Sequence, residues 1–376
     1  MTTLAHMIRD AGLVVAAGVS PRATSAGDTV LVMQPDHLGD ILLSQPAVRL
    51  LRQQLPDVRL VAVVGSWSSD IARMAWPVDD IVTVEFPGFT RAATRDPSAP
   101  YRKLKSAARS LAPLNAGIAI VLRPDAWWAA WLGSLVASEV ITSDDPRASR
   151  FATRQALLVD DEHAALRAAR IVAEWVGGEL PSPVTAPLSI PPCKSARDGT
   201  TSLLRAAGID SSYVVIHPGS GAAVKLWPES RWRQVIDALR NQGVSVVVTG
   251  SDGERDLCDR ITSGVDAVSL AGQTNIAGLL EIMRGATLAI GADSGPMHLA
   301  VAAETPTIHL FGPSDPCRYG PWGDPVRHRI ISAGWRCPRC GDLSPGRPAG
   351  CGCMLAITPE AVIATIDSLL STHATG

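Results

Sequence analysis

The segment ATLAIGADSGPMHLA, from Ala286 to Ala300, is typical of a buried strand that passes through a short turn into a helix. The first N–H groups of such a helix have no partner inside it and carry a partial positive charge, and Gly295 lets an anion approach the backbone closely. The segment therefore predicts an anion site, with Asp293 and Ser294 at the cap and His298 on the first turn. The alternative is that Asp293 or Ser294 only caps the helix and that His298 is a packing residue.

The same alternation of apolar strand and helix extends along the chain on both sides of this segment. In the first half we expect strands at Thr29–Met33, Val58–Gly65, Asp80–Phe86, Gly117–Leu122 and Glu139–Thr142, with helices at Gly39–Leu55 and Asp125–Ala137. In the second half we expect strands at Tyr213–His217, Val244–Gly250, Ala267–Leu270, Ala286–Asp293 and Pro306–Gly312, with helices at Glu229–Arg240, Gly253–Thr262, Asn275–Arg284 and Gly295–Ala303. Continuous apolar strands between helices predict parallel sheets that are covered on both faces.

A proline-rich stretch from Leu180 to Lys194 separates the two halves, because proline lacks the N–H that a helix needs. We therefore predict an α/β protein of two Rossmann-like domains, 1–182 and 183–376, that face each other. Ligands are expected at the carboxyl ends of the strands and in the cleft between the domains.

Composition excludes several classes of protein. The 376 residues carry a net charge of −2, so there is no basic field with which to bind nucleic acid. No apolar run reaches 18 residues, and the apolar stretch Ala11 to Val19 lacks the flanks of a signal peptide. We expect a soluble cytoplasmic protein, with a surface that touches the membrane as a peripheral contact.

Two more turns in the second half follow strands. His217, Gly219 and Ser220 begin HPGSGAAVKLWP, where Lys225, one of only four lysines, is able to reach a diphosphate. The alternative is an ordinary loop with a solvated lysine. In VTGSDGERDL, Glu254 is placed to accept hydrogen bonds from ribose, or else only to interact with a helix dipole.

In the first half, DHLGD follows the opening strand, and Gly39 permits a tight turn that presents Asp40 as a general base. The alternative is a first-turn helix residue without chemistry.

These motifs, in this order, resemble glycosyltransferase family 9, the ADP-heptose transferases. The resemblance rests on VLVMQPDHLGDILLSQP, VIHPGSGAAVKLWP, VVVTGSDGERD and LAIGADSGPMHLA, and it runs from Val30 to the C-terminus. It implies the GT-B fold, with an acceptor-binding N-terminal domain and a nucleotide-sugar-binding C-terminal domain. It also implies an inverting transfer that needs no metal or other cofactor.

Carried over to this chain, the resemblance makes Asp40 the base and Lys225 a contact to the diphosphate. Asp293, Ser294, Gly295 and His298 match the family's D-[ST]-G-x-x-H motif, so that Asp293 binds donor hydroxyls while Ser294 and Gly295 offer N–H groups to phosphate. This chain departs from the family pattern at Pro35, Asp36 and His37, which leaves the acceptor open. Trp127, Trp128 and Trp131 form either core or a ridge that faces lipid or acceptor.

Five of the seven cysteines fall near the C-terminus, and four of them form close pairs in a Gly- and Pro-rich loop, 337–353. Cys337, Cys340, Cys351 and Cys353 are suited to bind a structural Zn or Fe ion. Reduced thiols and a disulfide are the alternatives. The resemblance adds that protein-modifying heptosyltransferases of this kind carry a cysteine-ligated iron.

The sequence thus predicts a glycosyltransferase with a nucleotide-diphosphate sugar donor, ADP-heptose by resemblance. Its acceptor is a glycan, a glycolipid, a protein or a small molecule. Two other readings keep the fold: a nucleotide-sugar epimerase or hydrolase, and a non-catalytic nucleotide-sugar-binding subunit.

Overall fold

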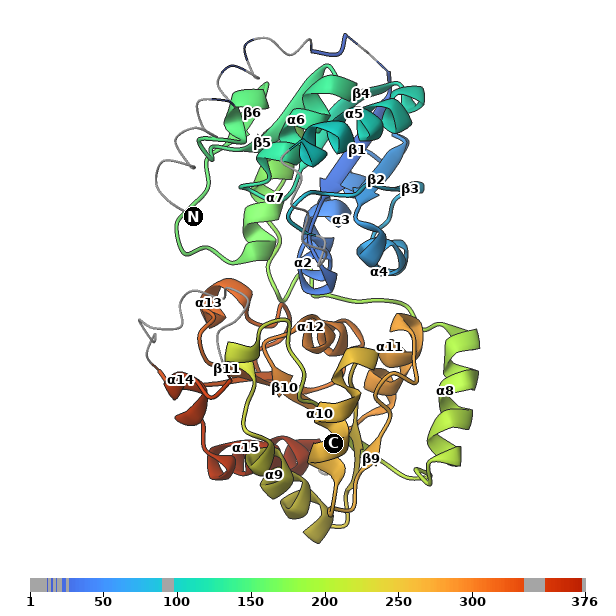
Figure 1. Ribbon diagram of the computed structural model, residues 1–376, viewed down its shortest axis with the longest axis vertical. Coiled ribbons are helices and arrows are strands. Elements are labelled where there is room, and N and C mark those ends of the chain that lie inside the picture. The colour runs from blue at the N-terminus through green and yellow to red at the C-terminus, as the bar shows by residue number, and fades with distance from the viewer. Residues whose placement is uncertain are drawn as a thin grey trace. The chain divides into compact units, whose positions relative to one another are not determined.

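The computed structural model describes residues 22–24, 27–89, 98–334 and 349–373, together with the single positions 12, 15 and 18. The chain divides into two compact units, Met1–Ser182 and Pro183–Gly376, and each is described by itself (Figure 1). The division falls within the proline-rich stretch, which holds no helix or strand before Lys194. The apolar run Ala11 to Val19 lies outside the described residues apart from those single positions.

The first unit contains a six-stranded parallel sheet in the order β3-β2-β1-β4-β5-β6. Its strands are β1 (Thr29–Gln34), β2 (Leu60–Val64), β3 (Asp80–Thr83), β4 (Ala116–Val121), β5 (Glu139–Ser143) and β6 (Arg154–Ala156). Its helices are α2 (Leu38–Leu43), α3 (Gln45–Gln54), α4 (Ser69–Ala75), α5 (Ala99–Leu111), α6 (Trp127–Val136) and α7 (Ala164–Val176). The described residues of this unit also form short 3-10 turns at η1 (Ser66–Ser68), η2 (Ala112–Leu114) and η3 (Ser149–Phe151).

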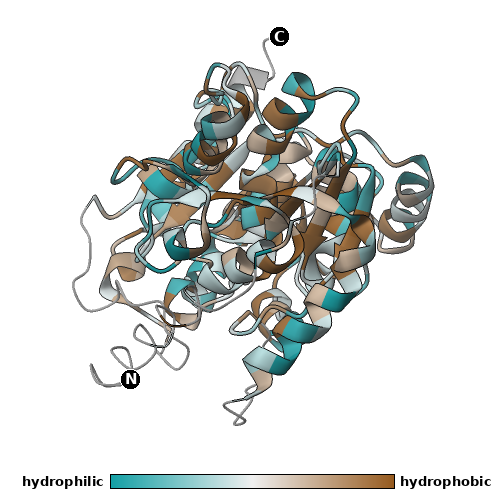
Figure 2. Cartoon of the chain, turned by 90° about the horizontal axis from the view of Figure 1, so that it is seen from above, coloured by the Kyte–Doolittle hydropathy of each residue, from teal (hydrophilic) through white to brown (hydrophobic). Residues whose placement is uncertain are grey.

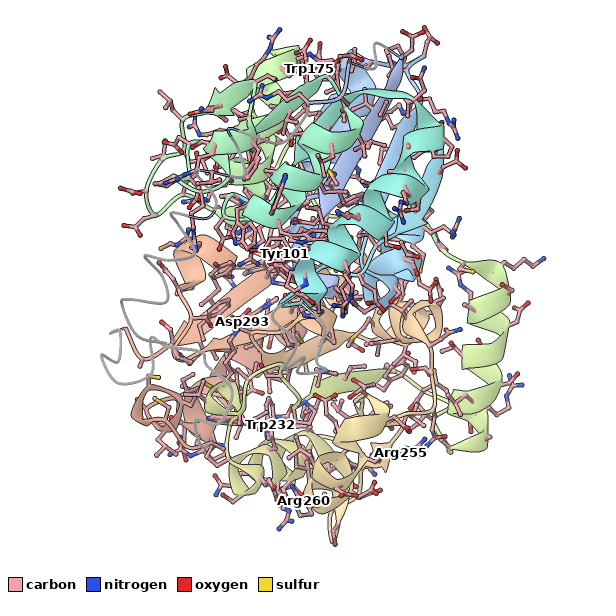
Figure 3. The ribbon with its side chains drawn as sticks, turned by 45° about the horizontal axis from the view of Figure 1, so that its top comes forward. Tyr101, Trp175, Trp232, Arg255, Arg260 and Asp293 are labelled. Atoms are coloured by element: carbon pink, nitrogen blue, oxygen red, sulfur yellow. The ribbon has the colours of Figure 1, made fainter. Side chains whose placement is uncertain are left out.

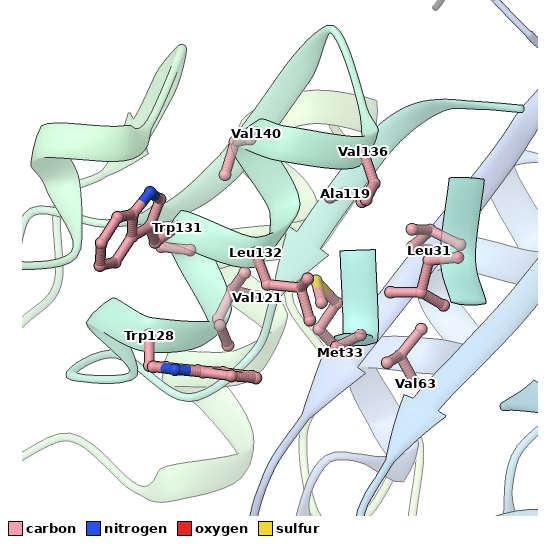
Figure 4. Close-up of a cluster of buried hydrophobic side chains, with 14 of the residues drawn as sticks. Leu31, Met33, Val63, Ala119, Val121, Trp128, Trp131, Leu132, Val136 and Val140 are labelled. Carbon is pink, nitrogen blue, oxygen red and sulfur yellow. The ribbon is translucent and has the colours of Figure 1, made fainter. Parts of the chain in front are cut away.

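Helices cover both faces of this sheet. Leu31 and Met33 of β1 join the apolar cluster formed with α5 and α6, which Figure 4 shows in close-up. Val30 and Val32 are equally buried and point to the opposite face, because side chains alternate along a strand. On that side α7 contacts the sheet and packs against α3. Burial on both faces explains why these strands are continuously apolar.

The second unit repeats this topology, with the order β12-β11-β10-β7-β8-β9 and every pair parallel. Its strands are β7 (Tyr213–His217), β8 (Ser245–Val248), β9 (Val268–Ser269), β10 (Leu288–Ala292), β11 (Thr307–Phe311) and β12 (His328–Ser332). Its helices are α8 (Lys194–Ala206), α9 (Glu229–Asn241), α10 (Arg255–Thr262), α11 (Ile276–Gly285), α12 (Gly295–Ala302), α13 (Pro316–Tyr319), α14 (Gly352–Leu355) and α15 (Pro359–His373). Two 3-10 turns, η4 (Ala223–Lys225) and η5 (Asp252–Glu254), follow β7 and β8.

In the second unit, helices likewise cover both faces of the sheet. Ile216 and Ile290 face α9, α10 and α15, and Trp232 of α9 is fully buried among them. Contacts from α11 and α12 reach β7, β10 and β11. The strands are correspondingly hydrophobic in Figure 2, while much of the helical surface is hydrophilic.

The order of the strands sets where a ligand is expected in each unit. In the first sheet, successive strands are added on one side of β1 up to β3 and then on its other side from β4 onward. In the second sheet, the same change of side occurs between β7 and β10. At such a switch point the loops after the two neighbouring strands diverge and leave a crevice at their carboxyl ends. The loops after β1, β4, β7 and β10 therefore form the candidate sites.

Two local predictions from the sequence are wrong in detail. The helix expected over Gly39–Leu55 is two helices, α2 and α3, because Pro46 cannot continue a helix and instead occupies the first turn of α3. The strand expected over Asp80–Phe86 ends at Thr83. For the tryptophans after β4, the core alternative is confirmed: Trp128 and Trp131 are core residues, and the partly buried Trp127 packs against the same cluster.

Among the residues that the structure describes, no helix is both long enough and apolar enough to cross a bilayer.

Candidate active site

The loops after β7 and β10 meet at the switch point of the second sheet. The Ser220 hydroxyl, after β7, donates a hydrogen bond of 3.3 Å to the carbonyl oxygen of Asp293, after β10. From the same first loop, Lys225 Nζ lies 2.7 Å from Asp293 Oδ2. The adjacency of β7 and β10 thus brings together residues 68 positions apart, and Figure 3 labels Asp293 at this place.

The Lys225–Asp293 ion pair is shielded from solvent, since the two side chains are only 17% and 8% exposed. From sequence we expected Lys225 to contact a diphosphate and Asp293 to contact donor hydroxyls. The structure shows the two side chains bound to each other. An anion that binds here meets an ammonium group already oriented by a buried carboxylate.

The start of α12 offers a polar group that none of the described residues satisfies. Ser294 is the N-cap residue, yet its side chain makes no capping hydrogen bond. Its hydroxyl oxygen is buried without a partner among the described residues, as is that of Ser314 in the loop after β11. Buried polar atoms are rarely left unpaired in native proteins, so such atoms indicate a site for a ligand or a water molecule. Gly295, the first residue of α12, follows directly.

His298 is buried on α12, and its ring lies 6.0 Å from that of His309 on β11, centroid to centroid. A hydrogen-bond chain leads onward: His309 Nε2 lies 2.9 Å from the Thr307 hydroxyl, which lies 2.9 Å from His328 Nδ1. Burial, together with the charges of His298 and His328, holds the pKa of His309 well below its usual value. His309 is therefore neutral, and its ring lies next to that of His298, which is expected to bind the donor.

Gly219 and Glu254 approach each other closely. A Cβ atom on Gly219 would lie 2.0 Å from Glu254 Oε1, so only glycine fits beside that carboxylate. The other oxygen, Oε2, accepts hydrogen bonds of 2.7 Å from the Ser251 N–H and from the Ser251 hydroxyl. Glu254 thus completes a capping box at the start of η5.

His217, at the end of β7, is buried, and its Nδ1 lies 3.1 Å from the Thr249 hydroxyl. Burial lowers the pKa of its imidazole, although the Glu254 carboxylate opposes this effect. The ring is therefore neutral near pH 7 and is anchored to the end of β8.

The first unit places Asp40 in the first turn of α2, directly after β1 and its loop. Asp36, in that loop, is buried and forms an ion pair with Arg123, which follows β4. Burial, followed by the charge of Asp40, raises the pKa of Asp36 to about 7. Asp36 and Asp40 are therefore close enough to affect each other's charge.

The Arg123 guanidinium is held from several sides. Besides Asp36, it binds Asp125, with 2.6 Å between Arg123 Nε and Asp125 Oδ1. It also lies over the ring of Phe89, 5.0 Å from the centroid. Sequence reasoning gave Arg123 and Asp125 no role. The available signal was of the kind used for Asp293, charged residues in the turn between a buried strand and the next helix.

The cysteine loop is only partly within the described residues. Cys337 and Cys340 lie outside them. The sulfur atoms of Cys351 and Cys353 are 3.2 Å apart, and Cys353 packs against Val224 beside Lys225. Over the part of the chain that the structure describes, no group of three or more His, Cys, Asp or Glu residues is arranged to hold a metal ion.

The chain is similar in sequence to known proteins. The model of the family glycosyltransferase family 9 (heptosyltransferase) matches residues 105–340. Lipopolysaccharide heptosyltransferase 1 of Pseudomonas aeruginosa is 24% identical over 319 residues, which cover 83% of this chain and 85% of that protein.

Many solved structures match this chain, and two of them illustrate the shared fold. The ADP-heptose lipopolysaccharide heptosyltransferase II of Escherichia coli has a TM-score of 0.74 at 19% identity, over 92% of this chain and 99% of that chain. An iron-containing dodecameric glycosyltransferase of enterotoxigenic E. coli has a TM-score of 0.53 at 17% identity, over 92% and 76%. The first of these likenesses confirms the predicted α/β, GT-B fold class.

Proposed function

Because this chain belongs to glycosyltransferase family 9, the heptosyltransferases, and is thus a glycosyltransferase, we propose that it transfers heptose from ADP-heptose to a saccharide hydroxyl of the lipopolysaccharide core. The donor follows the name of the E. coli structure with the same fold, and the acceptor follows the name of the P. aeruginosa relative. ADP-heptose and a lipopolysaccharide saccharide are therefore the proposed partners.

The observation that carries this proposal is the shielded Lys225–Asp293 pair at the switch point of the second sheet. Next to it are the unpaired Ser294 hydroxyl and the N-terminus of α12. An ammonium group and a helix N-terminus together favour a diphosphate. In this proposal His217, Gly219, Ser220, Glu254, Gly295 and His298 complete the donor site.

The chemistry is a single displacement at the anomeric carbon. The Asp40 carboxylate takes the proton of the acceptor hydroxyl, whose oxygen forms the new glycosidic bond while the bond from the anomeric carbon to the diphosphate breaks. The configuration at that carbon inverts. ADP leaves with the electron pair, and Lys225 and the α12 N–H groups stabilise its developing charge. This electrostatic role makes a metal ion or other cofactor unnecessary for the transfer.

A structural Zn or Fe ion at Cys337, Cys340, Cys351 and Cys353 is a separate part of the proposal. The described pair supports it, because two thiols 3.2 Å apart can both reach one ion with only a small adjustment. The iron-containing glycosyltransferase noted above has the same fold. Metal analysis of the purified protein and of Cys351→Ser tests this part: an equimolar metal content that the substitution removes is expected, and a metal-free wild type contradicts it.

We also propose that the protein acts at the cytoplasmic face of the membrane as a peripheral protein, where a lipid-linked acceptor is accessible. Fractionation of cells tests this. We expect part of the protein in the membrane fraction, and we expect salt to release it.

Substitution of Asp40 by Asn tests the proposed base. We expect transfer from ADP-heptose to fall by about 10²–10⁴-fold, the usual contribution of a general base. The affinity for ADP, measured by titration calorimetry, should not change. Asp70→Asn is the matched control, because Asp70 is also an acidic residue in the first turn of a helix in the first unit. Transfer by Asp40→Asn at the rate of the control would contradict the role of Asp40.

The donor is tested by the thermal stability of the wild type with ADP-, UDP- and GDP-sugars. A ligand that binds only the folded state raises its stability. We expect ADP-heptose to give the largest rise, and equal rises with all three nucleotides would refute the assignment to ADP.

A further inference from the structure

The second unit contains a cavity of about 440 Å³ between α8 and α11. α8 packs against α11, and Figure 1 shows the two helices next to each other. Tyr213, the first residue of β7, also lines the cavity, which therefore lies at the amino end of that strand. The candidate donor site lies at the carboxyl end of β7. The cavity is thus a separate site, and its volume falls within the roughly 300–1,000 Å³ of small-molecule sites.

Arginines outnumber acidic residues in the lining of this cavity. Arg197 and Arg205 belong to α8, and Arg284 belongs to α11. The acidic residues of the lining are Glu281 of α11 and Asp210, which lies in the loop before β7. The described lining therefore carries a net positive charge at neutral pH, which favours an anionic ligand.

The charge of Glu281 is neutralised within the chain. Its side chain is only 2% exposed, and its Oε1 accepts a hydrogen bond of 3.0 Å from the Cys193 N–H. Its Oε2 accepts one of 3.1 Å from Arg197 Nε, and Arg284 Nε lies 3.5 Å from Oε1. Arg284 also donates to two backbone carbonyl oxygens, at 3.1 and 2.6 Å. Glu281 and Arg284 thus form a fixed wall, and a ligand meets mainly the arginines of α8.

The two arginines of α8 keep donors for a ligand. Within the described part of the chain, Arg197 uses only Nε for a side-chain interaction, so its two Nη groups have no acceptor there. The Arg205 side chain has neither a hydrogen bond nor an ion pair to any described residue. The two residues are about two turns apart and line one side of α8. Two guanidiniums match the charge and the oxygens of a phosphate monoester better than those of a single carboxylate.

Asp210 sets what the rest of the ligand must carry. It is exposed, and its carboxylate has no partner among the residues that the structure describes. A bare anion held by the arginines of α8 would be repelled by this carboxylate, because like charges in one cavity repel each other. A ligand that also carries hydroxyl groups can instead donate hydrogen bonds to Asp210, and the Ser211 hydroxyl, which also lines the cavity, can donate or accept.

We propose that this cavity binds a small hydroxylated molecule with one phosphate monoester group, such as a phosphorylated sugar. The phosphate binds Arg197 and Arg205, and the hydroxyl groups donate to Asp210. The inference does not rest on the proposed transfer reaction, because the cavity lies at the opposite end of β7 from the donor site.

The same residues also hold the chain before α8. Glu281 accepts hydrogen bonds from both Arg197 Nε and the Cys193 N–H, and Arg284 donates to the Ile190 carbonyl oxygen. A ligand that fixes the Arg197 guanidinium therefore also fixes Glu281 and its bond to Cys193. Amide hydrogen exchange at Cys193 should slow when the cavity is occupied.

The probes are glucose 6-phosphate, glucose and inorganic phosphate, which separate the sugar from the charged group. Titration calorimetry with the full chain gives a Kd for each, with and without saturating ADP. We expect glucose 6-phosphate to bind at least about tenfold more tightly than either of the other two, since one charge-assisted hydrogen bond is worth about tenfold. ADP should leave this Kd unchanged, because it is expected at the other end of β7.

Arg205→Gln is the decisive variant. It should weaken binding of glucose 6-phosphate by about tenfold and leave the melting temperature unchanged, because Arg205 makes no side-chain contact of its own with a described residue. Arg109→Gln is the matched control, since Arg109 is also an exposed arginine in the last turn of a 13-residue helix, α5. Asp210→Asn should reduce the preference for glucose 6-phosphate over inorganic phosphate by about tenfold, because it removes both the acceptor for hydroxyls and the repulsion of a bare anion.

Three results would overturn the proposal: no binding of glucose 6-phosphate, its displacement by ADP, or a Kd for Arg205→Gln equal to that of Arg109→Gln. Equal binding of glucose 6-phosphate and inorganic phosphate would overturn the assignment to a hydroxylated ligand. Binding of glucose 6-phosphate as expected, without slower exchange at Cys193, would place the ligand elsewhere on the chain and contradict this site.

Discussion

Substitution of Lys225 by Met is expected to leave the Asp293 carboxylate shielded from solvent with no cation beside it. The pair is 2.7 Å long, and the two side chains are 17% and 8% exposed. Removal of one partner of a fully buried pair costs about 3–5 kcal/mol. Because Lys225 keeps some contact with water, we expect the lower end, about 3 kcal/mol.

The matching change in melting temperature follows from the size of the second unit. For 150–250 residues, about 1 kcal/mol lowers Tm by roughly 2–4 °C, so Lys225→Met should lower the Tm of this unit by roughly 6–12 °C. The double variant Lys225→Met/Asp293→Asn should recover much of that loss, because it no longer buries an unpaired charge.

Calorimetry of the two single variants and the double variant, in a double-mutant cycle, measures the coupling free energy directly. A loss in the double variant equal to the sum of the two single losses would refute the reasoning, since the buried pair would then contribute nothing.

Three more predictions concern packing and pH. Gly291→Ala should cost about 1–3 kcal/mol in denaturant unfolding, because its Cβ would lie 2.7 Å from the His217 carbonyl oxygen, whereas Gly221→Ala has nothing within 4 Å and should have little effect. Burial lowers the pKa of His328 from 6.5 to about 4, so the folded state loses stability as pH falls from about 6.5 to about 4, by about 3 kcal/mol in total, and His328→Gln should not show this loss. The pKa of Asp36 is raised from 3.8 to about 7. The folded state therefore holds this proton more tightly than the unfolded state does, and the folded state loses stability as the pH rises from about 4 to about 7. The stability of Asp36→Asn relative to wild type should therefore increase over that range, and a flat difference would contradict the assignment.

The sequence predicted most of the fold because the interior strands are marked by composition. β1, β2 and β7 are apolar at nearly every position, as strands buried on both faces must be. The edge strands β6 and β12 were missed because most of their residues are exposed, so polar residues replace the apolar signal. The break between α2 and α3 was missed even though Pro46 marks it.

The sequence singled out the residues of the candidate site one by one, but it did not predict the contacts between them. Lys225 and Asp293 were each identified from a loop after a strand, and their ion pair depends on β7 and β10 being neighbours. The Asp36–Arg123 pair joins residues 87 positions apart and depends in the same way on β1 and β4. Local patterns carry no information about which strands are adjacent, so these partners required the sheet order.

The separation of the two sheets has a consequence for how such a protein can change. Each sheet takes all six of its strands from one unit, and among the described residues no backbone ladder between strands crosses the junction of Ser182 and Pro183. A recombination event at that junction would leave both hydrogen-bond ladders whole. Inheritance of the two halves from different ancestors would therefore disrupt neither sheet. On the proposed division of roles, the acceptor preference could then change in residues 1–182 while the half that carries Lys225 and Asp293 stays as it was.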